Sequence, residues 1–197
     1  MPGSSVTSVT SAVPRFVLGD AVRLAAVASV VVGTAAYGFI GFALFMLVLG
    51  GSMLPRALAA PAALDLSFCV TLLIAAWAAE LDWYLAVGWL DVVVHAAATG
   101  LIAAMTHLAL VRLGACAGPD ESRLRRPRLG SAVVTTALGI SFATVWELLE
   151  WFGHTHVDDR IQVGYADTLG DLSAGSVGAV VAGVLLARGA LLAGAER

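Results

Sequence analysis

Apolar stretches long enough to cross a lipid bilayer recur along this chain. A helix needs about 20 apolar residues to span the hydrocarbon core, because it rises about 1.5 Å per residue. Of the 197 residues, 59% are hydrophobic and 13% are charged, whereas a soluble domain carries about 25% charged residues. The sequence therefore predicts an all-α protein, a polytopic bundle of transmembrane helices that contacts a lipid bilayer and no nucleic acid.

Six membrane spans are predicted, and together they form one transmembrane domain over residues 21–190. The first two could instead form one helix from Leu24 to Gly51, but 28 residues are long for a single span, and the intervening YGFIG stretch favours two. The Ser/Thr-rich start of the chain predicts a disordered cytoplasmic tail over residues 1–20. The predicted spans cover about residues 22–36, 39–54, 62–79, 91–113, 129–152 and 167–187.

Arginine determines the predicted orientation, because the chain contains eleven arginines and no lysine. Six alternating spans put ten arginines on one side of the membrane and leave only Arg160 on the other. Positive residues favour the cytoplasmic side, so both termini are predicted to be cytoplasmic. A five-span arrangement would instead place Arg15 and Arg23 outside. His107, about one turn from Arg112, is expected near the cytoplasmic surface as a hydrogen-bonded packing residue.

Acidic and histidine side chains gather at the opposite, outer ends of the predicted spans. Asp91 and His95 are four residues apart and therefore share a helix face. Glu147, Glu150 and His154 are spaced by three and four residues, so they share a face if the helix continues that far. Two helices are thus expected to present ionisable side chains at the same depth.

The last predicted span opens with Asp167 and Asp171, which are again four residues apart. The same step of four continues through Gly175, Ala179 and Gly183, and small residues at this spacing mark close helix packing in membranes. Both aspartates are therefore expected to point into the bundle. The small-residue seam can pack within one chain or between chains, so an oligomer formed through it is one expectation.

Helix capping is the alternative explanation for some of these acids. Asp91 and Asp167 lie at predicted helix N termini, where a carboxylate accepts hydrogen bonds from free N–H groups and meets the positive end of the helix dipole. Asp171 lies one turn further in, so capping explains it less well. Glu147 lies near the C-terminal end of its helix, where the dipole disfavours a carboxylate. Glu147 is therefore the acid that a purely structural role explains least.

A divalent metal is the predicted occupant of this outer cluster. Several carboxylates packed together repel one another unless they are protonated or share a cation. Carboxylates with one or two imidazoles suit Zn²⁺, Mn²⁺ or Mg²⁺. Glu150 and His154 are the candidates for a catalytic general acid or base. The predicted metal ligands are Asp91, His95, Glu147, Asp167 and Asp171.

The motifs LDVVVH, WELLEW and YADTLGDLSAGSVGAVVAG occur in this order along the second half of the chain. They resemble the YjdF-type membrane proteins and the broader VanZ-like group, which show an Asp-x-x-x-His at the start of one helix, a Glu-containing segment at the end of the next, and an Asp-x-x-x-Asp that opens a final Gly/Ala-rich helix. The resemblance implies a multi-pass protein of the bacterial inner (plasma) membrane. Members of the broader group have been linked to glycopeptide-antibiotic resistance, but the resemblance names no reaction.

Three functions remain open from the sequence. A membrane-embedded, metal-dependent enzyme would use its metal to activate water or to clamp a phosphate, with a lipid or lipid-linked envelope intermediate as its substrate. A cation- or proton-coupled transporter or ion-binding protein would use the same residues as a relay or a cation site. A structural or interaction protein would hold the acidic cluster without chemistry. The sequence therefore does not decide whether the protein is an enzyme.

Overall fold

Five helices of the structure are long and apolar enough to cross a membrane. A computed structural model describes residues 16–159, 161 and 163–191, so most of the predicted N-terminal tail lies outside the described residues. These described residues contain no strand, and the predicted all-α bundle of transmembrane helices is confirmed. The helices are α1 (Leu18–Ala57), α2 (Ala62–Glu80), α3 (Trp83–Ala86), α4 (Gly88–Arg112), α5 (Pro127–His156) and α6 (Tyr165–Ala187).

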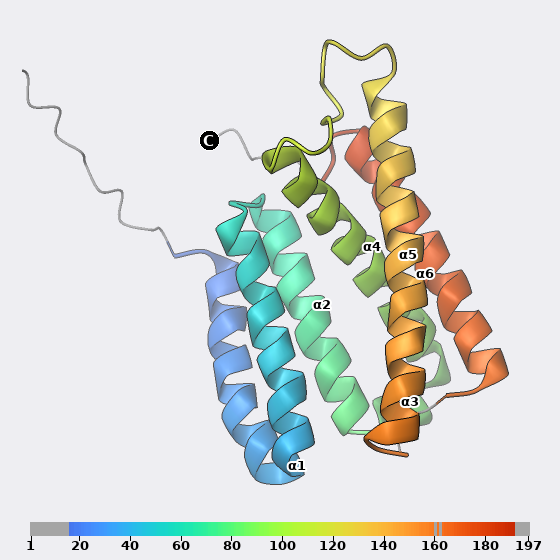
Figure 1. The fold of residues 1–197 in the computed structure, drawn as a ribbon. Helices are drawn as coiled ribbons and strands as arrows, with labels where there is room; N and C mark the ends of the chain where they lie inside the picture. Colours follow the sequence, from blue (N-terminus) through green and yellow to red (C-terminus); the bar gives the residue numbers. More distant parts are fainter. Residues whose placement is uncertain (1–15, 160, 162, 192–197) are drawn as a thin grey trace, which may run out of the picture.

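Helix α1 folds back on itself at Gly38 and contributes two antiparallel arms, each of about 20 residues (Figure 1). Gly38 has a φ of 66°, a value that residues with a Cβ atom rarely adopt. A hydrogen bond joins the two arms, because Nε of Arg23 donates to the carbonyl oxygen of Ser52, at 2.8 Å. Within the described residues, the chain therefore runs along the bundle six times, counting the two arms of α1 and the four other long helices, and the first break lies inside the YGFIG stretch, as the sequence predicts.

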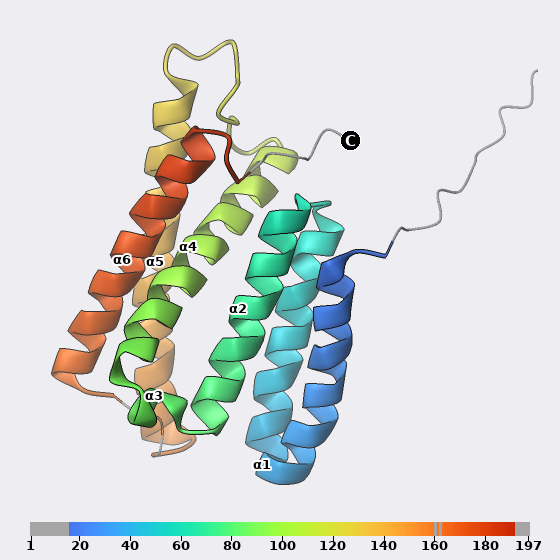
Figure 2. The same ribbon diagram turned by 180° about the vertical axis from the view of Figure 1, so that it is seen from behind.

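The bundle has two parts, the α1 hairpin with α2, and α4 with α5 and α6 (Figure 1 and Figure 2). Helix α2 joins the two parts, because it contacts both α1 and α4. The acidic and histidine residues of the three sequence motifs all lie on the three-helix unit of α4, α5 and α6. A buried apolar core packs α2 against α4 and α6, and its members are Leu64, Phe68, Ala104, Met105, Leu108, Ala182 and Leu186.

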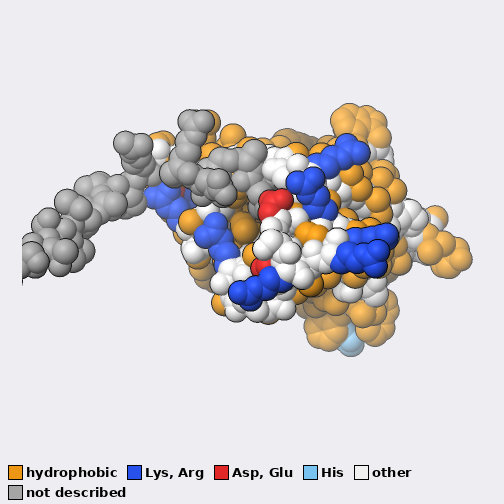
Figure 3. Space-filling model, turned by 90° about the horizontal axis from the view of Figure 1, so that it is seen from above, with side chains coloured by type: hydrophobic (Ala, Val, Ile, Leu, Met, Phe, Trp, Pro, Cys, Tyr) orange, Lys and Arg blue, Asp and Glu red, His pale blue; other side chains and the backbone are white. Residues whose placement is uncertain are grey.

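The two ends of the bundle differ in charge. At one end, which we call the arginine end, residues 113–126 connect α4 to α5, and Figure 3 shows the arginine side chains spread over this surface. At the other end, which we call the acidic end, lie α3, the first turns of α4 and α6, and the last turns of α5 (Figure 1). The exposed, described arginines of the arginine end are Arg112, Arg123, Arg125, Arg126, Arg128 and Arg188.

Where helices α4, α5 and α6 meet, their residues pack in layers. Each layer contains one residue from each helix, and successive layers are four residues apart along each helix. A Cβ atom added to Gly175 would lie 3.0 Å from Oγ1 of Thr99 and 3.1 Å from Cβ of Ala143. One layer further, a Cβ atom on Gly139 would lie 3.1 Å from Cβ of Ala103. We name these the Thr99 layer (Thr99, Ala143 and Gly175) and the Ala103 layer (Ala103, Gly139 and Ala179).

The small residues of α6 allow this close approach. A Cβ atom on Gly178 would overlap the backbone of Ala96 on α4, so only glycine fits at that crossing. A Cβ atom on Gly183 would lie 2.7 Å from the carbonyl oxygen of Ala132 on α5. The small-residue seam, which the sequence allows to pack either within or between chains, is thus packed within the chain.

Candidate functional site

His95 lies between two carboxylates at the acidic end. Its Nδ1 atom is 3.0 Å from Oδ1 of Asp91, one turn earlier on α4, and 3.2 Å from Oδ1 of Asp171 on α6. Helices α4 and α6 run in the same direction and pack side by side, so the residues that open one lie beside those that open the other (Figure 2). When Nδ1 donates its hydrogen to these carboxylates in the neutral ring, Nε2 keeps a lone pair that a metal ion can use.

Four potential metal ligands from three helices come together around His95. Each of the four residues offers one nitrogen or oxygen atom, and these atoms all lie within 4.8 Å of one another. Asp171 is 4% exposed, whereas the others are half-buried. Helix α5 runs antiparallel to α4, so its last turns bring its two glutamates to the first turns of α4 (Figure 1). We call this set the first group, formed by His95, Glu147, Glu150 and Asp171.

Asp171 also belongs to a second group, with Asp91 and Asp167, whose ligand atoms again lie within 4.8 Å of one another. A carboxylate has two oxygen atoms, so Asp171 can serve both groups at once. The two groups therefore form one connected centre of five carboxylates and one imidazole. Carboxylates this close repel one another unless protons or a cation lie among them.

The structure brings the predicted ligands together. All five, Asp91, His95, Glu147, Asp167 and Asp171, belong to the two groups. Glu150, one of the two predicted acid–base candidates, belongs to the first group. His154, the other candidate, belongs to neither. Its Nδ1 atom lies 2.6 Å from the carbonyl oxygen of Ile161, in the segment that leads to α6.

Tyr84 lies near the centre, although the sequence analysis does not single it out. Its hydroxyl group donates a hydrogen bond to the carbonyl oxygen of Ala75 on α2, at 3.1 Å. Burial raises the pKa of Tyr84, and the negative charges of Asp91, Glu150 and Asp171 raise it further. The phenol therefore stays protonated at neutral pH. In the sequence, its place in ELDWYLAVGW indicates only an aromatic residue at the membrane interface.

Two further side chains lie beside the glutamates of α5. The Thr168 side chain lies beside the carboxyl group of Glu147, and the Trp146 side chain lies beside that of Glu150. Thr168 directly follows Asp167, so the Asp-x-x-x-Asp segment that opens α6 also contains the threonine beside Glu147. The spacing of the acids gives no signal for the contact with Thr168, because it depends on how α5 meets α6, whereas Trp146 lies four residues before Glu150 on α5 itself.

Comparison with known proteins gives one match. A family model described as "Predicted membrane protein (DUF2238)" matches residues 16–190, which includes all residues of both groups. No curated protein and no solved structure matches the chain.

Proposed function

The chain belongs to the DUF2238 family of predicted membrane proteins, and from this premise we propose that it is a membrane-embedded metal-dependent enzyme that acts on a lipid or a lipid-linked envelope intermediate. The observation that carries this proposal is the first group, in which His95, Glu147, Glu150 and Asp171 offer ligand atoms within 4.8 Å of one another. These ligands come from three helices that pack closely, so the bundle holds them without relying on a loop.

The donor set favours a divalent cation. Metal–ligand bonds of about 2.0–2.6 Å allow two ligand atoms on one ion to lie about 3–5 Å apart, which matches the spacing of both groups. The first group mixes an imidazole with carboxylates, which suits Zn²⁺ or Mn²⁺, and the second group offers only oxygen, which suits Mg²⁺ or Mn²⁺. A bound cation would polarise a phosphate or activate a water molecule.

The depth of the site favours a lipid substrate. Three exposed tryptophans, Trp83, Trp89 and Trp151, lie on α3, the start of α4 and the end of α5. Tryptophan prefers the headgroup level of a bilayer, so the centre lies at that level too. The exposed, described arginines lie at the opposite end (Figure 3), so the positive charge for a lipid phosphate would come from the cation. Glu150, half-buried in the first group, is better placed as a general base than His154. In that role it would not coordinate the metal, so the other three residues of the first group would hold the cation.

Metal content tests this proposal directly. Purified protein saturated with Zn²⁺, Mn²⁺ or Mg²⁺ and then desalted is expected to retain stoichiometric metal by elemental analysis. Glu147→Gln is expected to lose most of it, because the neutral amide lacks the charge that holds the cation. Glu121→Gln, in the loop at the arginine end, is the matched control and is expected to retain metal. Retention of no metal by the wild-type protein, or equal retention by all three proteins, would contradict the proposal.

The orientation follows from the same charge asymmetry. We propose that the arginine end faces the cytoplasm and that the acidic end faces outward across a plasma membrane, because positive loops favour the cytoplasmic side. Cys116, a free cysteine in the loop between α4 and α5, gives a native probe, whereas Cys69 is buried.

A membrane-impermeant maleimide is expected to label Cys116 in inside-out vesicles and not in intact cells. Cys116→Ser is expected to abolish that label, and Asp159→Cys in the same background, on the segment between α5 and α6, is expected to be labelled from outside. Labelling of Cys116 in intact cells would reverse the proposed orientation.

A further inference from the structure

Two buried polar side chains of the three-helix unit have no hydrogen-bond partner among the described residues. His107 on α4 is 1% exposed, and neither of its ring nitrogens is paired. Thr135 on α5 is 0% exposed, and its hydroxyl group is unpaired as well. The expectation that His107 is a hydrogen-bonded packing residue is therefore not met by any described protein group. Buried polar atoms are rarely left unpaired, because the loss of their water contacts is costly.

The step of four residues that relates the layers predicts that His107 and Thr135 lie at the same level. Four residues forward on α4 correspond to four residues backward on antiparallel α5, from the first group at His95 through the Thr99 layer to the Ala103 layer. Continuing the same step would reach His107 on α4, Thr135 on α5 and Gly183 on parallel α6, where Gly183 packs against α5. Gly183 has no side chain to occupy this level or to pair with the other two. We call this set the His107 layer.

Thr135 also differs from two other threonines of the bundle. Thr106 and Thr144 donate to the carbonyl oxygen four residues earlier, as threonines within helices commonly do. Thr135 makes no such bond, so its hydroxyl group remains available to another partner. One turn further toward the arginine end, the hydroxyl group of buried Ser131 donates to the carbonyl oxygen of Ala117, at 3.4 Å. This contact places a polar side chain one turn from Thr135, on the side of the arginine end.

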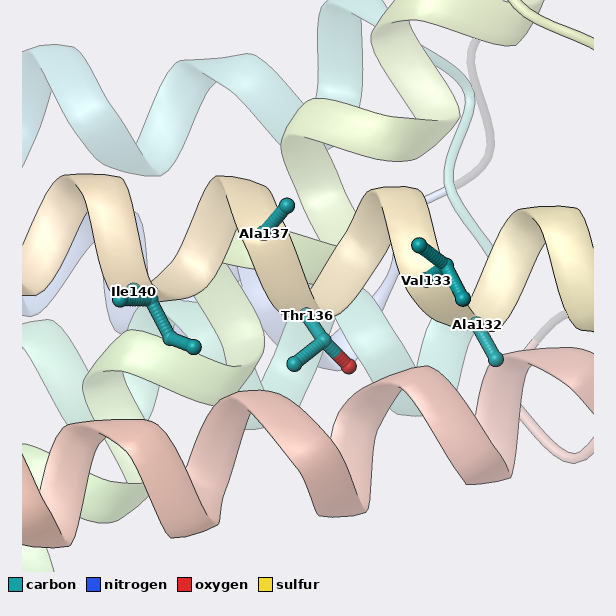
Figure 4. Close-up of a pocket in the computed structure, with 5 residues that line it drawn as sticks. All are labelled: Ala132, Val133, Thr136, Ala137 and Ile140. Carbon is teal, nitrogen blue, oxygen red and sulfur yellow. The ribbon is translucent and has the colours of Figure 1, made fainter.

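The lipid-facing side of α5 does not offer such a partner. A groove of about 330 Å³ runs along this side next to α6, and Figure 4 shows its lining residues. Four of the five are apolar, and the fifth, Thr136, points toward α6 and donates to the carbonyl oxygen of Ala179, at 3.5 Å (Figure 4). This groove suits a lipid acyl chain and not water.

We propose that the His107 layer is an internal water-binding site, in which buried water bridges the imidazole of His107 and the hydroxyl group of Thr135. Water can donate to one ring nitrogen, accept from the other or from the hydroxyl group, and so pair the atoms that the protein leaves unpaired. Water enters from the arginine end past Ser131, because the small residues of the Ala103 layer close the seam toward the acidic end. The site lies twelve residues from His95 along α4, about 18 Å, and does not depend on a bound metal.

Nuclear magnetic resonance on protein with ¹⁵N-labelled histidine tests the proposal without any substitution. A cross-peak between water and a buried imidazole is expected, and His107→Leu assigns it by removing it. Thr135→Val, which keeps the shape of the side chain, is expected to weaken or abolish the cross-peak. Absence of a water cross-peak at His107 in the wild-type protein would overturn the proposal, whatever the variants do.

Thermal unfolding gives a second readout. Thr135→Val and His107→Leu are each expected to lower the melting temperature, and the double variant is expected to lose little more than the larger single loss, because both remove the same water-mediated contact. His107→Leu with Thr144→Val, whose hydroxyl group already has a partner, is the control and is expected to be additive. A dry layer would give the opposite result: each substitution would raise the melting temperature, and the two effects would add. If His107→Leu fails to fold, the water cross-peak of the wild-type protein and of Thr135→Val decides.

Discussion

Replacing Asp171 by asparagine is expected to remove cation binding from both groups of the centre, a larger loss than any other single substitution there should cause. Asp171 belongs to both groups, is 4% exposed, and contacts Nδ1 of His95 at 3.2 Å. The substitution removes a negative charge shared by two sets of ligands, and it leaves Asp91 as the remaining carboxylate in contact with Nδ1 of His95. Loss of a partner outside the ligand shell typically costs about 10–100-fold in metal affinity, so loss of this shared ligand should exceed about 100-fold.

Isothermal titration with Zn²⁺ and Mn²⁺ measures this loss. Asp167→Asn is the matched control, because it lies one turn away on the same helix and belongs only to the second group. It is expected to retain binding at the first group. The melting temperatures of both metal-free variants should be compared with that of the wild-type protein to exclude unfolding. If Asp171→Asn and Asp167→Asn bound these ions equally well, the shared role of Asp171 would be wrong.

Replacing Asp65 by alanine is expected to destabilise the fold by about 3–5 kcal/mol, the typical cost of leaving a buried charge without its partner. Asp65 on α2 pairs with the guanidinium group of Arg23 on α1, and the two residues are 4% and 5% exposed. Arg23 also contacts Oδ1 of Asp20 at 2.9 Å, so part of its charge stays compensated. The free energy of unfolding in mixed micelles is the measurement that checks this prediction.

Two comparisons separate the buried ion pair from a general effect of charge removal. Asp120→Ala removes the partner of Arg128 in an exposed pair at the arginine end, and its effect should stay within about 0.5 kcal/mol. The double variant Arg23→Leu with Asp65→Leu removes both buried charges together and should recover much of the lost stability. A cost of less than about 1 kcal/mol for Asp65→Ala would show that Arg23 does not need Asp65.

The passes of the chain could be predicted from the sequence because a bilayer fixes the length of an apolar helix. The division of the first apolar stretch into two helical arms could be predicted too, since a glycine at the turn can adopt the positive φ of Gly38. Residues 16–190 match the family model, so the resemblance to YjdF-type proteins is confirmed. The link to VanZ-like proteins, the plasma membrane and cation- or proton-coupled transport stay predictions.

The spacing of residues along each helix predicts only part of the candidate site. Steps of four residues put Asp91 with His95, and Asp167 with Asp171, on shared faces, but spacing within one helix does not say which faces meet. The position of Tyr84 depends on a turn at Asp82, which has a φ of 55°, and no local pattern indicates a turn of this kind. The unpaired state of His107 depends on what α5 and α6 present at its level, which a single helix cannot reveal.

The order of the helices along the chain also determines when the centre can form during synthesis. Helices enter the membrane in chain order, and Asp171 lies on α6, after both α4 and α5. A nascent chain inserted only as far as α5 carries His95 and the two glutamates without the aspartate that both groups share. A growing chain therefore cannot assemble the complete ligand set in advance, and the proposed cation binding would be tied to the insertion of α6.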